Sequence, residues 1–401
     1  MSSNFRRLFA ASVAGAALLA AGSASAQEEI NVGIILGFTG PLESITPGMA
    51  ASAELAFNEV NESGLLLEGQ KITPIRADST CIDNAAAVAA AERLVTADNV
   101  AAIMGADCSG VTIGIANGVA VPNGVVMVSP SATSPALTDI EDNDYFFRTA
   151  PSDARQGIVL TEVLTSQGIK SVAVSYTNND YGKGFSDAFV AAFEEAGGEV
   201  TIAAPHDDGK GDYSAEVGAL AAAGGEVLVV LGYVDQGGVG IIRSSVDTGA
   251  FDRFALGDGM YGDSLIEAIG EPLEGTIGVL PGAEGEGSEM FATAAKAADI
   301  DPTSSYTGES YDAAALIALS IQKAGSADRT AIRDAMLEVA NGPGEPILPG
   351  ELAKGLQILK DGGDVDYVGV TNVELIGPGE AAGTYREYVV EGGEFKTVGY
   401  R

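Results

Sequence analysis

Short apolar runs alternate with longer segments of helical spacing through most of the chain. Strands are predicted at 30–38, 72–77, 101–104 and 125–128, with helices between them at 49–61, 85–97 and 111–119. A second series begins after residue 151, with strands predicted at 171–175, 200–203, 227–231 and 254–256 and helices at 184–196, 214–222 and 236–247. Continuously apolar strands are typical of parallel sheets buried on both faces. Two successive series therefore predict two similar α/β lobes.

Two neighbouring strands of the first series end in turns rich in hydroxyl groups. Ser109 follows the run at 101–104, and Ser131 and Thr133 follow the run at 125–128. Ligands of open parallel sheets bind outside the carboxyl ends of the strands, and hydroxyls beside helix N-termini suit an anionic group. Each residue taken alone is better explained as a helix N-cap. Two consecutive loops with the same chemistry favour a site for a carboxylate.

Three strands of the second series end in Tyr181, Tyr233 and Asp258. A tyrosine in this position usually packs at a sheet edge, and a lone aspartate usually caps a turn. Together they offer two aromatic surfaces and a carboxylate opposite the hydroxyl-rich edge of the first lobe. A carboxylate suits an ammonium group, and tyrosine suits an apolar side chain or a cation. Residues 254–264 contain no Arg or Lys, so Asp258 has no cationic partner nearby in the sequence.

The first 26 residues have the pattern of a secretory signal peptide. Arg6 and Arg7 precede the apolar stretch 8–21, and Ala24-Ser25-Ala26 is a small-residue cleavage site. The apolar stretch is shorter than the roughly 20 residues that span a bilayer. We expect cleavage near Ala26 and export without membrane insertion. The predicted cleavage point has no Cys, so a bacterial lipid anchor has no attachment site there.

The two cysteines, Cys81 and Cys108, are the only ones in the chain. An even pair in an exported protein is most simply a disulfide. The competing interpretation is a metal or redox pair, but neither cysteine lies in a CxxC motif or near a histidine. We therefore predict a disulfide that joins the loop of Ser109 to the loop that follows the strand at 72–77.

Charge and motif content disfavour several classes of function. The formal net charge is −35, which excludes binding to nucleic acid or to an anionic membrane surface. His206 is the only histidine and is expected in a surface loop, so a catalytic triad or a histidine metal site has little to build on. No phosphate-binding loop and no Gly-x-Gly-x-x-Gly turn occurs. We expect neither an enzyme nor a metal or cofactor site.

Several short motifs resemble those of one family in order and spacing: Thr39-Gly40-Pro41, the Cys81 and Cys108 pair, Pro130-Ser131-Ala132-Thr133, Asp180-Tyr181-Gly182-Lys183-Gly184, Gly232-Tyr233 and Asp366-Tyr367-Val368-Gly369. Over the whole mature chain, the sequence resembles the periplasmic substrate-binding proteins of ABC transporters for branched-chain amino acids, the leucine/isoleucine/valine-binding type.

The resemblance implies a type I periplasmic binding protein, with two Rossmann-like lobes joined by a hinge of three crossovers. The N-terminal lobe would comprise 27–148 and 281–378, and the C-terminal lobe 149–280 and 379–401. It also implies a periplasmic monomer that closes by hinge motion on an amino acid and docks on a membrane permease. The alternatives are a ligand sensor of the same fold, for amides or short carboxylates, and a binding protein for aromatic carboxylates.

The resemblance also assigns roles to individual residues. The hydroxyls of Ser109 and Thr133 would bind the ligand carboxylate, with backbone groups of Ser131 and Thr133 beside them. Asp258 stands where the family has a glutamate that pairs with the α-ammonium, and Tyr181 and Tyr233 would close over the ligand. Two further differences are Ser131 in place of an alanine, and Ile45 in place of an aromatic residue beside the ligand side chain.

Overall fold

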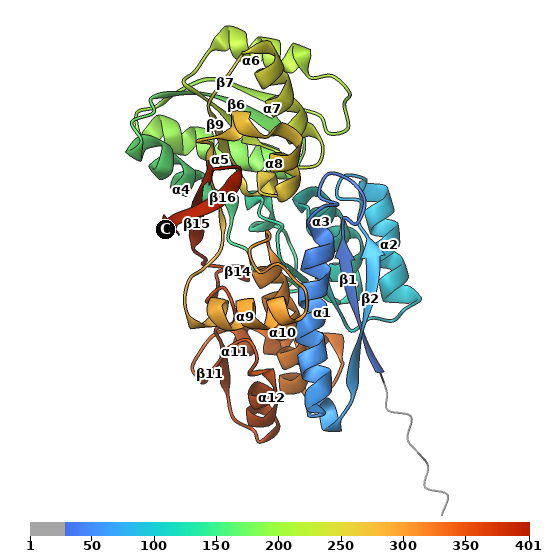
Figure 1. Cartoon of the computed structure of the whole chain (residues 1–401). Helices are drawn as coiled ribbons and strands as arrows, with labels where there is room; N and C mark the ends of the chain where they lie inside the picture. Colours follow the sequence, from blue (N-terminus) through green and yellow to red (C-terminus); the bar gives the residue numbers. More distant parts are fainter. Residues whose placement is uncertain (1–28) are drawn as a thin grey trace, which may run out of the picture.

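The computed structural model describes residues 29–401, so the predicted signal peptide lies outside the described residues. Figure 1 shows two lobes, one above the other, each built on its own sheet. Within the described residues each of these sheets has seven strands, in the orders β13-β14-β5-β4-β3-β1-β2 and β16-β15-β10-β9-β8-β6-β7. The central strands are parallel, and helices flank both sheets. The predicted α/β architecture of two similar lobes is therefore confirmed.

The first lobe contains both N-terminal and late segments of the chain. Its strands are β1 (Glu29–Leu36), β2 (Lys71–Asp78), β3 (Ala102–Gly105), β4 (Val126–Ser129), β5 (Phe146–Arg148), β13 (Leu375–Ile376) and β14 (Glu380–Ala381). Its helices are α1 (Thr46–Ser63), α2 (Asn84–Thr96), α3 (Ser109–Ile115), α9 (Glu286–Ala297), α10 (Thr307–Ala324), α11 (Arg329–Ala340) and α12 (Leu352–Lys360). A small parallel pair, β11 (Glu345–Ile347) and β12 (Val365–Tyr367), completes it.

The second lobe contains most of the middle of the chain and its C-terminal hairpin. Its strands are β6 (Ser171–Thr177), β7 (Glu199–His206), β8 (Val227–Leu231), β9 (Phe254–Leu256), β10 (Ile277–Pro281), β15 (Tyr385–Glu391) and β16 (Glu394–Tyr400). Its helices are α4 (Asp153–Ser166), α5 (Asp180–Glu195), α6 (Ser214–Ala223), α7 (Gly237–Thr248) and α8 (Asp263–Ile269).

The predicted strands and helices of both series are all present, with ends that differ by a few residues. The largest difference concerns the helix predicted at 111–119, which is α3 followed by a wider helical turn over Ala116–Ala120. Helix α10 has little amphipathic pattern of its own, and its surroundings explain why. It packs against α1, α11, β3 and β4, and nearly all of its residues are buried. A helix enclosed on all sides needs no polar face.

The chain passes between the two sheets at three places. The first crossing follows β5, the second follows β10, and the third lies between β14 and β15. The lobe boundaries implied by the resemblance put the third crossing near Gly379, where the second segment of the C-terminal lobe was expected to begin. Glu380 pairs with Arg148 in the first sheet, so the chain leaves that sheet only after Ala381.

One further expectation was wrong. His206 does not lie in a surface loop: it ends β7 and is 1% exposed. Its Nδ1 lies 2.8 Å from the Ser175 hydroxyl, and burial lowers the pKa of its imidazole to about 4. Among the described residues, no helix combines the length and the hydropathy that crossing a membrane requires.

Candidate ligand-binding site between the lobes

The loops that follow β3 and β4 are bonded to each other and form the first-lobe face of the site. The Ser109 hydroxyl accepts a hydrogen bond from the backbone N–H of Ser134 at 3.1 Å, and the Ser131 hydroxyl donates to the carbonyl of Asp107 at 3.1 Å. The Ser131 hydroxyl proton is therefore used within the protein, whereas that of Ser109 remains available. The Thr133 hydroxyl is fully buried and has no hydrogen-bond partner among residues 29–401.

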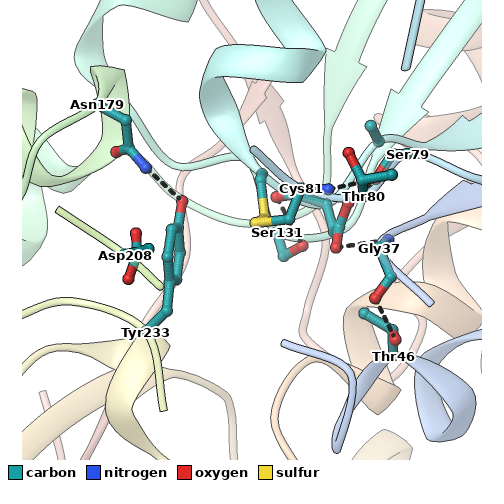
Figure 2. Close-up of a disulfide and its surroundings, with 12 residues drawn as sticks. Gly37, Thr46, Ser79, Thr80, Cys81, Ser131, Asn179, Asp208 and Tyr233 are labelled. Carbon is teal, nitrogen blue, oxygen red and sulfur yellow. Dashed lines mark hydrogen bonds between the residues drawn. A yellow bond between two sulfur atoms is a disulfide. The ribbon is translucent and has the colours of Figure 1, made fainter. Parts of the chain in front are cut away.

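A buried carboxylate and a disulfide fix these loops from behind. Asp107 accepts hydrogen bonds from the backbone N–H of Gly37 at 2.9 Å and from the hydroxyl of Ser79 at 2.9 Å. Burial raises the pKa of Asp107, and these hydrogen bonds oppose the rise. The predicted disulfide between Cys81 and Cys108 is present, with the two Cα atoms 5.2 Å apart (Figure 2). It ties the turn after β2 to the residue that precedes Ser109.

The Sγ atoms of the two cysteines and the carboxylate of Asp107 lie close together. Because both sulfur atoms are joined in the disulfide, no thiolate is available there to bind a metal ion.

Tyr181 and Tyr233 form an aromatic wall on the second lobe. Their rings are stacked with centroids 5.2 Å apart, and both side chains are buried. The Asn179 amide donates to the Tyr233 hydroxyl at 3.4 Å, a contact drawn in Figure 2. Burial raises the pKa of both tyrosines well above the ordinary value, so their hydroxyls stay protonated at neutral pH. Because the Tyr181 hydroxyl donates to Asp258, the wall can offer a ligand its apolar faces and the hydroxyl proton of Tyr233.

Asp258 lies two residues after β9 and is buried. Its Oδ1 accepts hydrogen bonds from the Gln156 amide at 2.9 Å and from the Tyr181 hydroxyl at 3.0 Å, and its Oδ2 accepts one from the Tyr306 hydroxyl. Burial raises the pKa of Asp258, and the three hydrogen bonds oppose the rise. Its partners are thus neutral donors rather than a cation.

Tyr306 makes this arrangement a contact between the lobes. It immediately precedes α10 of the first lobe, whereas Gln156, Tyr181 and Asp258 belong to the second. Its φ of 60° places it in the left-handed region, which is uncommon for a tyrosine. Sequence analysis did not identify Tyr306, because nothing in the local pattern marks it as facing a loop of the other lobe.

Arg148 is a second residue whose contacts the sequence did not predict. Only its position at the end of the first segment of the N-terminal lobe was expected. The side chain is 1% exposed, and its guanidinium donates to the carbonyls of Ala132 at 3.1 Å and Ser134 at 2.9 Å. It also donates to the Thr138 hydroxyl at 2.9 Å and pairs with Glu380 near the third crossing. Arg148 therefore holds the loop of Thr133 in place from the hinge.

The lobes are in direct contact around these residues. Asp235 of the second lobe donates its N–H to the Pro41 carbonyl at 3.1 Å, and its carboxylate accepts from the Ser44 N–H at 2.8 Å. In a further contact between the lobes, the Ser134 hydroxyl donates to the Asp180 carbonyl at 2.9 Å. The chain is therefore in a closed arrangement.

The predicted site residues of the two lobes thus lie on opposing faces of this contact. Ser109, Ser131 and Thr133 come from the first lobe, and Tyr181, Tyr233 and Asp258 from the second. Ile45 is buried and lies beside Gly262 of the second lobe. The fold and this arrangement define a protein of the two-lobed binding-protein class, with the candidate site residues between its lobes.

Comparison with known proteins agrees with this class. The family described as periplasmic binding protein matches residues 29–349, and the chain belongs to that family. Its relatives include Leu/Ile/Val-binding protein homolog 3 of Brucella melitensis, 32% identical over 327 residues, which are 80% of this chain and 86% of the relative. The leucine-, isoleucine-, valine-, threonine- and alanine-binding protein of Pseudomonas aeruginosa is 30% identical over 327 residues, with coverage of 80% and 86%.

Solved structures share the fold at lower sequence identity. A leucine binding protein from Thermotoga maritima has a TM-score of 0.77 and 23% identity, and the match covers 92% of this chain and 98% of that one. A solute binding protein from R. palustris, in complex with 4-hydroxybenzoate, has a TM-score of 0.76 and 18% identity, with coverage of 93% and 97%. These two structures confirm the predicted fold.

Proposed function

We propose that this protein captures a branched-chain or related hydrophobic amino acid between its lobes and delivers it to the membrane permease of an ABC transporter. It acts as a monomer in the periplasm, after cleavage near Ala26. The single observation that carries the proposal is the opposition of a hydroxyl-lined loop on one lobe to buried carboxylate and tyrosine side chains on the other. A zwitterion with an apolar side chain complements both faces.

The roles of the site residues follow from their contacts. Ser109 and Thr133 donate their hydroxyl protons to the ligand carboxylate, since neither proton is used within the protein. Backbone groups of Ser131 and Thr133 contribute beside them, while Asp258 faces the α-ammonium. The stacked rings of Tyr181 and Tyr233 cover the ligand from the second lobe. The names of the Brucella and Pseudomonas relatives support the choice of a branched-chain amino acid.

A second candidate is a protein that binds aromatic carboxylates. The observation in its favour is that Asp258 already accepts three hydrogen bonds from neutral donors, so it does not depend on a ligand ammonium for all its partners. The R. palustris structure holds 4-hydroxybenzoate on the same fold. In this case the hydroxyls of Ser109 and Thr133 would still bind the ligand carboxylate. The rings of the aromatic wall would stack on the aromatic ring of the ligand.

Thermal unfolding with a panel of ligands distinguishes the two candidates. Leucine, isoleucine and valine are tested beside 4-methyl-2-oxopentanoate, the keto acid analogue of leucine, and beside 4-hydroxybenzoate. A ligand present at about 100 times its dissociation constant adds about 2.7 kcal/mol to the free energy of unfolding, which gives a clear rise in Tm. A rise with the amino acids alone supports the proposal. A rise with 4-hydroxybenzoate alone supports the second candidate.

Delivery to a transporter needs a separate test in cells. A strain that lacks the gene is expected to lose uptake of radiolabelled leucine at low external concentration, and the wild-type gene is expected to restore it. Normal uptake in the deletion strain, combined with tight binding by the purified protein, would instead favour a ligand sensor.

A further inference from the structure

A cavity of about 210 Å³ lies beside the second crossing, and we call it the hinge cavity. Its walls come from both lobes: α9 and the start of α10 from the first, β15 and β16 from the second, and residues 280–283 at the crossing itself. The six predicted ligand-binding residues lie outside these walls. One water molecule needs only about 10–15 Å³ of such space, so the hinge cavity can hold a small polyatomic ion.

Two cationic side chains line the hinge cavity, one from each lobe. Lys296 lies near the end of α9, and Arg386 lies in β15. None of the ion pairs among residues 29–401 includes either of them. Within the described chain, both positive charges are therefore without a carboxylate partner, although the formal net charge of the protein is −35.

Arg386 is held in place and still has donor capacity that the protein does not use. Its Nη2 donates to the Thr303 carbonyl at 3.1 Å, and its Cζ lies 4.8 Å from the centroid of the Tyr261 ring. Its Nε is buried and has no hydrogen-bond partner in the part of the chain that the structure describes. A buried donor without a partner is unfavourable, and the planar guanidinium fork suits the oxygens of an oxyanion. An oxyanion beside Arg386 would therefore be bound by charge and by hydrogen bonds.

The one acid that lines the hinge cavity, Glu309, does not neutralise the two cations at neutral pH. It lies in the first turn of α10 and is 4% exposed. Burial raises the pKa of its carboxyl to about 8, Asp312 adds to the rise and Arg386 opposes it. At pH 7 this carboxyl is mainly protonated and can itself donate a hydrogen bond. The lining of the hinge cavity is therefore positively charged.

We propose that the hinge cavity binds a small oxyanion, such as sulfate, inorganic phosphate or a short carboxylate, which bridges Lys296 of the first lobe and Arg386 of the second. The inference goes beyond the proposed function, because this anion is not the transported ligand. The negative charge of the rest of the protein opposes the approach of an anion, but at physiological ionic strength it is largely screened beyond about 8 Å.

The position of the hinge cavity links it to closure of the lobes. Opening the hinge would separate Lys296 from Arg386, so the anion binds the closed arrangement better than the open one. Tyr306 lines the hinge cavity and also donates to Asp258 in the candidate ligand site. A ligand that favours closure and an anion that favours closure must each raise the affinity for the other by the same factor. The anion is therefore expected to strengthen leucine binding.

The test uses sulfate, whose charge is constant around neutral pH. Tm is recorded against sulfate concentration, with the ionic strength kept constant by sodium chloride. Exclusion of sulfate from protein surfaces raises Tm without saturation, so a bound ion is recognised by a saturating rise. Arg386→Gln removes the second-lobe cation, and Lys296→Glu reverses the first-lobe one. The controls Arg253→Gln and Lys71→Glu make the same changes of charge at exposed positions of the same lobes, outside the hinge cavity.

Charge-assisted hydrogen bonds account for the expected size of the effect. Arg386→Gln and Lys296→Glu should each weaken sulfate binding at least about tenfold, whereas both controls should match wild type. Leucine is then titrated by calorimetry with and without saturating sulfate at equal ionic strength. Sulfate should raise leucine affinity about fivefold or more in wild type and in the controls, and should leave it unchanged in the two cavity variants. Each variant is compared with itself, so a change in its basal leucine affinity does not enter the ratio.

The outcomes decide each part of the inference. If sulfate, phosphate and acetate all act like chloride on wild type, the hinge cavity is not an anion site. A saturating effect that persists in both cavity variants would place the bound ion elsewhere and overturn the proposal. Loss of the effect in the variants without any change in leucine affinity would refute the bridging of the lobes. A stronger response to acetate than to sulfate or phosphate would identify the anion as a carboxylate.

The test remains decisive if one variant or the proposed ligand fails. If Arg386→Gln does not fold, Lys296→Glu decides alone, because the side chain of Lys296 is exposed and its replacement leaves the core intact. If leucine does not bind wild type, the proposed function is wrong. The sulfate titration needs no amino acid, so it still confirms or excludes the anion site.

Discussion

The hydrogen bond from Tyr306 to Asp258 offers a direct test of whether the closed arrangement contributes to ligand affinity. Among the described residues, it is the hydrogen bond that joins the Asp258 carboxylate to the first lobe. Tyr306→Phe keeps the ring and removes only the hydroxyl. Asp258 then loses the one donor on its Oδ2, while Gln156 and Tyr181 still serve Oδ1.

The expected magnitude follows from the chemistry of that bond. A hydrogen bond to an ionised group contributes about 1.5–3 kcal/mol. The bond forms only when the lobes meet, so its loss shifts the equilibrium from the closed to the open arrangement. If the ligand-free protein is mainly open, the full free energy appears in the dissociation constant. Leucine affinity is then expected to fall by a factor of about 10 to 150.

Calorimetry with leucine measures this effect, and Tyr388→Phe is the matched control. Tyr388 is also buried, but its hydroxyl has no hydrogen-bond partner in the part of the chain that the structure describes, so its removal breaks no bond there. Small-angle scattering should show the wild type becoming more compact with leucine, and Tyr306→Phe should need more leucine for the same change. If Tyr306→Phe binds leucine as tightly as Tyr388→Phe does, the hydrogen bond from Tyr306 to Asp258 does not stabilise the closed arrangement.

Three further predictions concern the stability of the protein and the aromatic wall. The disulfide closes a loop with a sequence separation of 27, so replacing Cys81 and Cys108 by Ser should lower the free energy of unfolding by about 3–4 kcal/mol, measured by denaturant titration; two free thiols found by alkylation and mass measurement of the native protein would contradict the bond itself. Burial raises the pKa of Glu309 to about 8 from an ordinary 4.5, so its stabilising contribution is complete below pH 4.5 and is lost as the pH rises towards 8. Between pH 6.5 and 8 this corresponds to about 2 kcal/mol, and Glu309→Gln should flatten the fall in Tm over that range; an unchanged slope would refute it. Tyr233→Ala should weaken leucine binding in calorimetry on protein shown by circular dichroism to be folded, and full retention of affinity would contradict a role of Tyr233 in covering the ligand.

The sequence predicts the fold well because parallel strands that are buried on both faces appear in it as short, uninterrupted apolar runs. Runs such as 227–231 and 254–256 coincide with β8 and β9. The residues in the turns that follow such strands, including Ser109 and Asp258, can then be predicted to lie at the edge where ligands bind. His206 shows the limit of that approach: Pro205-His206-Asp207-Asp208-Gly209 has the composition of a turn, but β7 extends through His206 and buries its ring.

The sequence did not predict the roles of Gln156 and Tyr306, because these roles depend on contacts with residues that are distant in the sequence. Gln156 and Asp258 are separated by 102 positions, and Tyr306 and Asp258 by 48. No periodicity within α4 distinguishes Asp153 from an ordinary acidic residue in the first turn of a helix, which the helix dipole favours in any protein. Asp153 differs from such an ordinary residue in that its side chain is buried and its carboxylate oxygens accept no hydrogen bond from the described residues. Both properties come from tertiary packing, which the sequence of α4 does not reveal.

The position of Asp153 next to a crossing also bears on the order of events during closure. Arg148 binds the carbonyls of the hydroxyl loop and Glu380 near the third crossing, so this loop and the hinge form one unit of the first lobe. In a hinge rotation, displacement grows with distance from the hinge. Asp153 begins the helix that follows the first crossing, whereas Tyr233 follows β8, which is separated from the crossing strand β10 by β9. Asp153 should therefore move least relative to Thr133, and Tyr233 should travel further. The charged end of the ligand would then bind to a largely preformed site beside the hinge, and closure would bring the aromatic wall over its side chain.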